Sequence, residues 1–428
     1  MKTLLCALSI LTAPALAFQS VHVVNGGSGG ALQAAIDAAA DGDTVLVHGG
    51  SFGHVAITAK SLTLVAEPTL DTVVAGVAIS SLSANQRVVV SGLEVSSTSM
   101  VGVQITNCLG RVRLDALFAH GATPQSSVDA LVANGAVDVA CTNSTFTGGA
   151  QIPTPGPNPT PSFQAGRGVV SVGSGLTLYE CVVTGGDGQT GHFINTVFTD
   201  APAGIGGAGL ECDASSSVFA GRSAIRGGSG GMGRELACAQ LPCGIPPTPG
   251  GAGGLGLSAA LGANVTVHDT TVSGGPGGSG GLGGQCCPQT VWPQAGSGAA
   301  GSAEQGTITH LPGSGVTLSA PAVVRVGQLL PLQIAGTPGD TIFLAVSGQT
   351  RAVFDPLFSG VFLFGPAARR SSFGIVPGSG VLSVSIPVGT LPSGAQSVER
   401  FLQVLARNPA GQLRLGDPAF VTVLDPAF

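Results

Sequence analysis

Six segments of this chain share one pattern of apolar residues and turns, and this internal repeat limits the fold more than any other feature. Four of the segments end in a Gly-Gly pair, which begins at positions 148, 185, 227 and 274. Two earlier segments, from Arg87 and Arg111, fit the same frame without the pair. A pattern that recurs every few tens of residues indicates a stack of similar units.

Apolar residues occupy three positions of this frame. Nine residues before the pair stand Val88, Val112, Val139, Leu176, Val218 and Val265; seven before it, Val90, Leu114, Cys141, Leu178, Ala220 and Val267; two before it, Val95, Ala119, Phe146, Val183, Ile225 and Val272. The first two positions describe a short strand with one face inward, and the third requires a bend in between. The pattern predicts stacked coils, each coil being one turn of a solenoid, because one coil cannot bury its inner face alone.

The bend position lies five residues before the pair. Its residues are Gly92, Ala116, Asn143, Glu180, Arg222 and Asp269. The three charged residues predict a stripe that points outward, with Arg222 between two acids. The repeat lengthens from 24 and 27 residues to 37, 42 and 47, while the strand and bend keep their length. The extra residues are therefore expected in long Gly-rich loops on one side of the coils. The glycines in these loops are expected to allow backbone conformations that other residues rarely adopt.

The opening ALQAAIDAAADGDTVLVHGGSFGHVAITAKSLTLVAE, residues 31–67, together with the repeat, resembles the right-handed parallel β-helix of the pectate-lyase-like superfamily. The resemblance covers about residues 22–310 and implies an all-β fold. Leu32, Ala35, Ile36 and Ala39 form one apolar helical face, and Gly42 stops the helix. We expect this helix to cap the open end of the first coil, whose strand edges would otherwise pair with other chains.

The composition changes after the last Gly-rich loop. Short alternating runs, such as 382–386, are separated by turn signals such as 377–380, and nine of the 17 Phe residues follow position 342. This pattern predicts a small C-terminal β-sandwich. The expected organisation is a signal peptide over 1–17, a β-helix over 18–315 and a β-sandwich over 316–428.

Residues 1–17 have the form of a secretory signal. Lys2 is followed by the apolar run 4–13 and the small-x-small sequence 15–17, which predicts a secreted or cell-surface protein whose mature chain begins at Phe18. Eight cysteines would then remain, and an oxidising compartment favours their pairing. The best candidates for disulfides are Cys238, Cys243, Cys286 and Cys287, with their connectivity open.

The charge of the mature chain limits its partners. Loss of Lys2 from a net charge of -6 leaves about -7, and Lys60 becomes the only lysine. Nucleic acid binding needs basic patches and is not expected. No second apolar run of 18 or more residues is present, so we expect no membrane span. Arg111, Arg113 and Asp115 are expected to be solvated.

The catalytic sets of glycan-cleaving β-helix enzymes have no full counterpart here. Only Gly191-His192-Phe193 is similar to the Gly-His-Gly segment of polygalacturonase-like enzymes, and no Asp-Asp occurs. One remaining cluster could supply an acid and a base, or oxygen ligands for calcium. It comprises Asp187, His192, Asp200, Glu211 and Asp213. The alternative is that these are scattered surface charges, and no cofactor is assigned.

Ligand binding is the other candidate role. Sugar-binding grooves use flat aromatic faces, and this chain has one Tyr and one Trp. Tyr179 would flank the stripe of Glu180, Arg222 and Asp269, whereas Trp292 would be either a platform or a loop anchor. We therefore expect a non-catalytic protein with a structural, adhesive or polysaccharide-binding role. Its candidate partners are extracellular polysaccharide or cell-surface components. The alternative is a divergent polysaccharide lyase or glycoside hydrolase.

Overall fold

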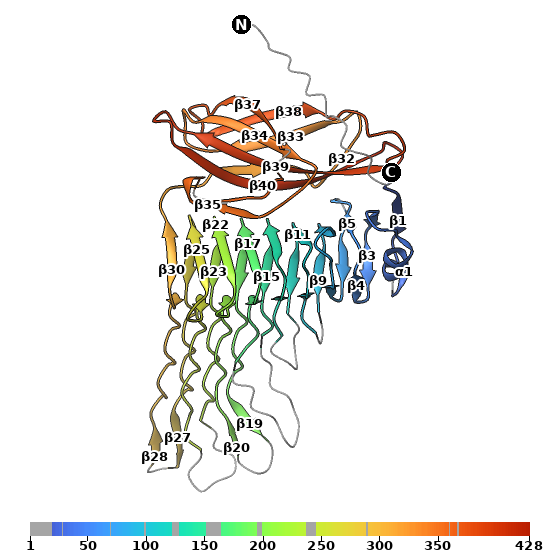
Figure 1. Ribbon diagram of the computed structural model, residues 1–428. Helices are drawn as coiled ribbons and strands as arrows, with labels where there is room; N and C mark the ends of the chain where they lie inside the picture. Colours follow the sequence, from blue (N-terminus) through green and yellow to red (C-terminus); the bar gives the residue numbers. More distant parts are fainter. Residues whose placement is uncertain are drawn as a thin grey trace.

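The fold is nearly all β, with one short α-helix, and it is built around three long parallel sheets (Figure 1). A computed structural model describes residues 19–27, 29–68, 70–97, 100–121, 128–150, 164–194, 199–236, 245–287, 290–358, 360–365 and 368–428. The predicted signal peptide lies outside these residues. Successive coils add one strand to each sheet in turn, which is consistent with the predicted parallel β-helix.

Sheet A has ten strands. In spatial order they are β1 (Val21–Asn25), β2 (Thr44–His48), β5 (Leu62–Ala66), β8 (Arg87–Ser91), β11 (Arg111–Asp115), β14 (Asp138–Thr142), β17 (Gly175–Tyr179), β22 (Ser217–Gly221), β25 (Asn264–His268) and β30 (Ile308–Leu311).

Sheets B and C have eight strands each. Sheet B contains β3 (Gly50–Phe52), β6 (Thr72–Val74), β9 (Glu94–Ser96), β12 (Phe118–His120), β15 (Thr145–Thr147), β18 (Val182–Thr184), β23 (Ala224–Arg226) and β26 (Thr271–Ser273). Sheet C contains β4 (Val55–Thr58), β7 (Val77–Ser80), β10 (Val103–Thr106), β13 (Leu131–Asn134), β16 (Val169–Val172), β21 (Leu210–Cys212), β24 (Leu257–Ala259) and β29 (Glu304–Gln305).

The predicted apolar columns lie inside the coils. Val88 pairs in register with Val112, and the column continues through Val139 and Leu176 to Val218. Each of these side chains is at most 2% exposed and belongs to one continuous core. Burying a side chain of this size contributes about 1.5–3 kcal/mol. The prediction that these columns share a dry interior is confirmed.

The predicted bend joins each strand of sheet A to the next strand of sheet B. The bend residues Gly92, Ala116, Asn143, Glu180, Arg222 and Asp269 all have positive φ, between 48° and 75°. Residues other than glycine rarely adopt this conformation, and it costs them about 1–2 kcal/mol. The same turn at the same place in these six coils keeps their strands in register.

The helix α1 (Ala31–Ala38) lies at the first coils and contacts β1, β2 and β4. Leu32 and Ile36 are at most 1% exposed and belong to the core of the coils. The ammonium group of Lys60 donates hydrogen bonds to the carbonyl oxygens of Ile36 (2.8 Å) and Ala39 (2.9 Å), where the helix leaves such groups unpaired.

Long Gly-rich arms leave the coils on one side, as predicted, and run side by side (Figure 1). The sequence did not predict that these arms pack into an ordered body, which we call the glycine array. Its described segments are 148–150, 164–168, 185–191, 203–209, 227–236, 248–256, 274–283 and 295–303.

Hydrogen bonds in the glycine array recur every three residues. The N–H groups of Gly185, Gly188 and Gly191 donate to the carbonyl oxygens of residues 226, 229 and 232 in the next coil. Other glycines bond across to the returning arms, as Gly228 does to Gly207 (2.8 Å). A three-residue repeat is that of the polyproline II helix, whose backbone has no internal hydrogen bonds and can bond to its neighbours. The array thus has two bonded layers.

Residues 316–428 form two further sheets that share one core. One sheet contains β31 (Thr317–Ser319), β33 (Leu329–Ala335) and β38 (Val381–Pro387); the other contains β32 (Val323–Arg325), β40 (Leu413–Leu424), β39 (Ser397–Arg407), β34 (Thr341–Ser347) and β37 (Arg369–Ile375). We call residues 316–428 the C-terminal module. Figure 1 shows it on the side of the coils opposite the glycine array.

Three hairpins and one turn complete the fold. They are β19 (His192–Ile194) with β20 (Thr199–Ala201), β27 (Gly284–Cys287) with β28 (Thr290–Trp292), β35 (Val353–Asp355) with β36 (Gly360–Phe362), and the 3-10 helix η1 (Pro356–Phe358). The first two lie at the far end of the glycine array in Figure 1. Within the described ranges, no helix is both long and apolar enough to cross a membrane.

Candidate functional site

The outer face of sheet A is covered by the C-terminal module. Ala140, Tyr179 and Phe219 on this face pack with Phe401 and Phe420 of β39 and β40. A second apolar contact lies at the first coils, where Leu46 and Val65 meet Val323 and Leu424. Sheet A is therefore buried on both faces. The sequence carried a signal for this, because strands such as Arg87–Ser91 contain three consecutive apolar residues, Val88 to Val90, without alternation.

A buried ion pair on the outer face of sheet A contacts the module at this interface. The guanidinium of Arg113 is fully buried, lies 2.7 Å from the carboxylate of Asp138 and donates to the Thr350 hydroxyl at 2.6 Å. The same carboxylate accepts a hydrogen bond from the Ala352 N–H at 3.1 Å. Burial alone would raise the pKa of Asp138, but the charge of Arg113 holds it below its ordinary value. The expectation that Arg113 and Asp115 are solvated is wrong, since Asp115 is only 5% exposed.

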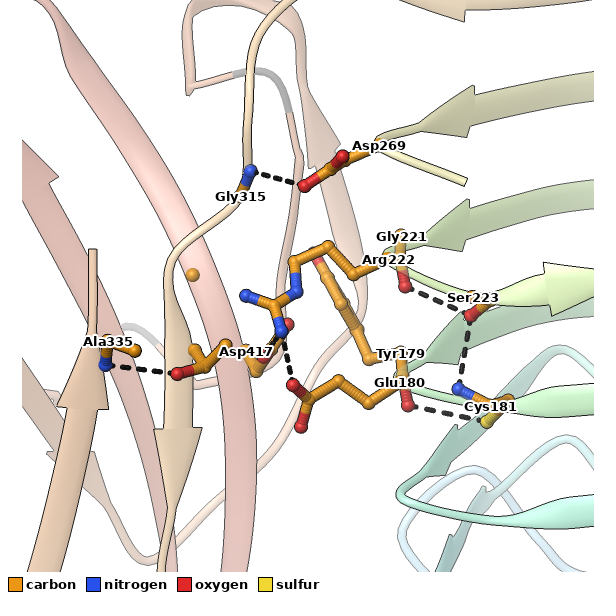
Figure 2. A network of polar contacts seen from close by, with 12 residues as sticks. Tyr179, Glu180, Cys181, Gly221, Arg222, Ser223, Asp269, Gly315, Ala335 and Asp417 are labelled. Carbon is orange, nitrogen blue, oxygen red and sulfur yellow. Dashed lines mark hydrogen bonds and ion pairs between the residues drawn. The ribbon is translucent and has the colours of Figure 1, made fainter. Parts of the chain in front are cut away.

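The charged bend residues point out of the coils; Glu180 and Arg222 face the module and are partly buried, whereas Asp269 is exposed (Figure 2). Arg222 contacts the carboxylate of Glu180 and lies 3.6 Å from that of Asp417 in β40. Asp269 accepts a hydrogen bond from the N–H of Gly315 at 2.9 Å. We expected these residues to form a ligand-binding stripe, and the structure places Glu180 and Arg222 instead between the coils and the module. No local feature of the sequence indicates which segment covers them.

Tyr179 lies in the same interface. It is 3% exposed, and its hydroxyl accepts from the N–H of Val361 (3.0 Å) and donates to the carbonyl of Val361 (3.2 Å). Its ring packs beside Phe219 with centroids 5.4 Å apart. The phenol therefore anchors the hairpin β35–β36 on sheet A, and its face is not open to a ligand. Burial raises the pKa of this hydroxyl well above its ordinary value.

Asp417 is the least satisfied group of the network. It is 1% exposed, and within the described residues neither of its carboxylate oxygens meets the geometry of a hydrogen bond. Burial and then the neighbouring Glu180 raise its pKa well above the ordinary value, while Arg222 acts in the opposite direction. Two carboxyl groups thus share one guanidinium, which favours a proton on Asp417.

A cavity of about 230 Å³ lies between sheet A and the hairpin β35–β36. Its floor includes Thr177, Phe219 and Thr266, which are register partners on the outer face of three neighbouring strands. Its roof includes Phe354 and Val361. The remaining lining residues are Val137, Gly175, Leu176, Ser217, Val218, Asn264 and Ala352. All lining residues are uncharged. Sequence reasoning placed Leu176 and Val218 in the apolar columns but proposed none of the lining residues for ligand binding.

The proposed catalytic cluster is spread over separate elements. The carboxylate of Asp187 accepts from the N–H of Ser229 at 2.8 Å, and that of Glu211 pairs with Arg167 at 2.9 Å. His192 and Asp200 belong to β19 and to the antiparallel β20, and their side chains lie outside the described residues. Among the part of the chain that is described, no group of three or more His, Cys, Asp or Glu could hold a metal ion.

Asp213, the fifth member of that cluster, caps a turn between two coils. Its carboxylate accepts hydrogen bonds from the Ser216 hydroxyl (2.6 Å), the N–H of Gly173 (2.9 Å) and the Ser215 hydroxyl (2.8 Å). These bonds, led by that from Ser216, lower the pKa of Asp213 to about 2. An ionised, saturated acceptor of this kind serves the turn and is a poor general acid at neutral pH.

The remaining predicted residues lie at the far end of the array. Trp292 ends β28, opposite Gly284 of β27, and is half-buried. The four cysteines proposed for disulfides fall outside the described side chains. Four other cysteines, Cys108, Cys141, Cys181 and Cys212, are buried as free thiols inside the coils. Cys141 thus lies inside the coils, at the apolar column position that the repeat predicted.

Comparisons with known proteins do not assign the chain to a family. No protein-family model matches it, and no curated protein matches it. Among solved structures, a superoxide reductase (neelaredoxin) from Ignicoccus hospitalis is 13% identical and covers 26% of this chain and 80% of that chain, with a TM-score of 0.17. The sulfur carrier protein SoxY from Chlorobium limicola f thiosulfatophilum is 18% identical over 26% and 80% of the two chains, with a TM-score of 0.15. Likeness this low carries no argument.

Proposed function

We propose that this chain is a secreted or cell-surface protein with a structural, adhesive or polysaccharide-binding role, and that it is not an enzyme. In this proposal the coils form a right-handed parallel β-helix, α1 caps the first coil, and the C-terminal module is a β-sandwich. The glycine array is the observation that carries the proposal. It is a large ordered body that offers few groups for chemistry.

The array is built for stiffness. Glycine loses more backbone freedom on folding than any other residue, so an ordered glycine-rich body needs strong compensation. Here that compensation is hydrogen bonding within and between two layers, together with very close packing. A Cβ on Gly251 would lie 1.9 Å from the carbonyl oxygen of Gly204, so side chains are excluded from the inside of the array. A rigid projecting arm suits a spacer or a contact surface.

The C-terminal module acts as a brace in this proposal. It contacts the first coils, where the Thr44 and Ser397 hydroxyls lie 2.8 Å apart, and also the last coils, where Leu311 joins the shared apolar cluster. A module held along nearly the whole solenoid limits bending between coils. This is expected of a protein that bears load or presents a surface at a fixed angle.

Binding and turnover assays on the purified mature protein test this role. It is incubated with neutral and uronic-acid polysaccharides, both soluble and insoluble, and with whole cells. We expect retention on at least one of these materials and no release of reducing ends or unsaturated products. Clear turnover would overturn the proposal and favour a divergent polysaccharide lyase or glycoside hydrolase. No retention on any material would remove the adhesive role.

Matched glycine variants test the part played by the array. Gly251→Ala introduces a methyl group inside the array, whereas Gly296→Ala places one where no atom lies within 4 Å. We expect the first to weaken retention and the second to leave it unchanged. Hydrogen exchange first establishes that Gly251→Ala disrupts the array. If both variants are then retained equally, the array is excluded as the surface that contacts the polysaccharide or the cell.

Secretion is tested separately. Expression of the full chain in a secreting bacterial host should yield a mature N-terminus at Phe18, determined by mass spectrometry. A cell-retained chain that keeps Met1 would contradict the proposed localisation.

A further inference from the structure

Two threonine hydroxyls of the interface cavity lack hydrogen-bond partners within the described chain. Thr177 is 5% exposed and Thr266 is 9% exposed, and both line the cavity floor. Both hydroxyl oxygens reach the solvent-accessible space of the cavity, so each is free to bond to water or to a ligand there.

The cavity also offers aromatic faces. Phe219 separates the two threonines on the floor and is 4% exposed, while Phe354 in the roof is 45% exposed. Their ring centroids lie 6.0 Å apart. The exposure of Phe354 and of Val137 shows that one side of the cavity is open to solvent. Aromatic faces beside hydroxyl and amide groups suit a molecule that has both C–H and O–H surfaces.

Size and charge narrow the class of ligand. A volume of about 230 Å³ exceeds the roughly 30 Å³ of one water several times and is below the roughly 300–1,000 Å³ of drug-sized sites. One sugar ring fits this range. No lining residue is charged, and an ionised group would be buried there without a partner, at a high cost. The lining therefore disfavours uronic acids and amino sugars.

We propose that this cavity binds one neutral monosaccharide unit, free or at the end of a glycan. The hydroxyls of Thr177 and Thr266 and the amide of Asn264 bond to its hydroxyl groups, and Phe219 and Phe354 contact its C–H face. The proposal deepens the polysaccharide-binding part of the proposed function and rests on it. It does not depend on the glycine array.

Titration calorimetry on the full mature chain tests the site. The probes are methyl glycosides of glucose, galactose and mannose, each set against the uronate or amino sugar of the same ring. We expect millimolar binding of at least one neutral glycoside, with the charged analogues binding at least tenfold more weakly. Equal binding of charged and neutral probes, or binding of neither, would overturn the proposal; the latter would leave ordered water as the occupant.

The double variant Thr177→Val/Thr266→Val removes both hydroxyls and keeps the shape of the side chains. We expect it to bind the neutral glycoside about tenfold or more weakly, since each lost bond commonly costs several-fold. Its unfolding midpoint should change little, because both hydroxyls face the cavity and the substitution keeps the shape of the side chains. Thr63→Val is the control: this residue is also buried in sheet A, but it does not line the cavity. Unchanged affinity in the double variant would refute the site. Retention on polysaccharide that survives it would leave the proposed function intact.

Discussion

Replacing one buried glycine of the array should disrupt it locally and measurably. At Gly228 an added Cβ would lie 1.9 Å from the carbonyl oxygen of Gly186 and 2.5 Å from its carbon. Ordinary contacts of this kind need about 3.5 Å, so the arm must move by about 1.5 Å. Two 2.8 Å hydrogen bonds anchor Gly228 across the layers, to Gly207 and from Gly254, and neither survives such a shift.

The magnitude follows from these losses. Each hydrogen bond contributes about 0.5–1.5 kcal/mol net, and overpacking costs about 1–3 kcal/mol. Gly228→Ala should therefore destabilise the array by about 2–6 kcal/mol. Gly296→Ala has no atom within 4 Å of its Cβ and should be neutral, or stabilising by a few tenths of a kcal/mol.

Native-state hydrogen exchange is the appropriate assay, because the array can open without the coils unfolding. In Gly228→Ala, the amides of Gly228, Gly254 and Gly275 should exchange faster by a factor that matches the lost stability. Amides inside sheet A, such as that of Val112, should keep their wild-type protection. Wild-type exchange in Gly228→Ala, or equal acceleration in Gly296→Ala, would refute the close packing described for the array.

Three further predictions concern charged residues, each measured by urea unfolding. Arg113→Met leaves Asp138 buried without its partner and should cost about 3–5 kcal/mol, while Arg111→Met on the same strand should change little; similar losses would contradict the buried-pair assignment. The pKa of Asp213 is lowered to about 2, so its stabilising contribution is complete above its unfolded value of about 3.9 and is lost as pH falls below it. In Asp213→Asn the free energy of unfolding should therefore depend less on pH below about pH 3.9. An unchanged pH dependence would contradict the turn-capping role of Asp213. The pKa of Asp417 is raised by burial, so the stability that this residue contributes decreases as pH rises above the unfolded-state pKa of about 3.9. Asp417→Asn should therefore be more stable than wild type at pH 7 and equally stable below about pH 3.9. A variant that is less stable at pH 7 would contradict this sign.

The interior of the coils could be predicted from sequence because its pattern is local and repeated. Val112 needs only Val88 and Val139 in the neighbouring coils to be buried, and the frame that aligns them is visible in the chain. The bend is equally local, since a positive φ is set by the turn between two adjacent strands. Even a charged residue such as Arg222 adopts it when the coils above and below impose the same turn.

The cover over sheet A could not be predicted, because it depends on contacts between distant segments. Arg113 is paired with Asp138 in its own sheet, but it is covered by the module, whose Thr350 lies 237 residues away in the sequence and accepts a hydrogen bond from it. An arginine on a strand is usually solvated, and only knowledge of the covering segment reverses that expectation. The glycine array, in contrast, does have a sequence pattern that indicates it: Gly-Gly pairs recur every three residues from positions 227 and 274, which is the spacing of its hydrogen bonds.

The covered face also limits how a glycan could meet this protein. On the outer face of sheet A, Leu46, Val89 and Ala140 are all at most 3% exposed, so a long chain has no open path across the strands there. The cavity at β17, β22 and β25 opens along one side, where Val137, Ser217, Asn264 and Phe354 meet solvent. A ligand that reaches Thr177 must therefore enter from this side, and a volume of about 230 Å³ holds about one sugar ring. We therefore expect a glycan to be recognised by a terminal unit, so capping that unit should abolish binding, whereas extension at the other end of the glycan should not.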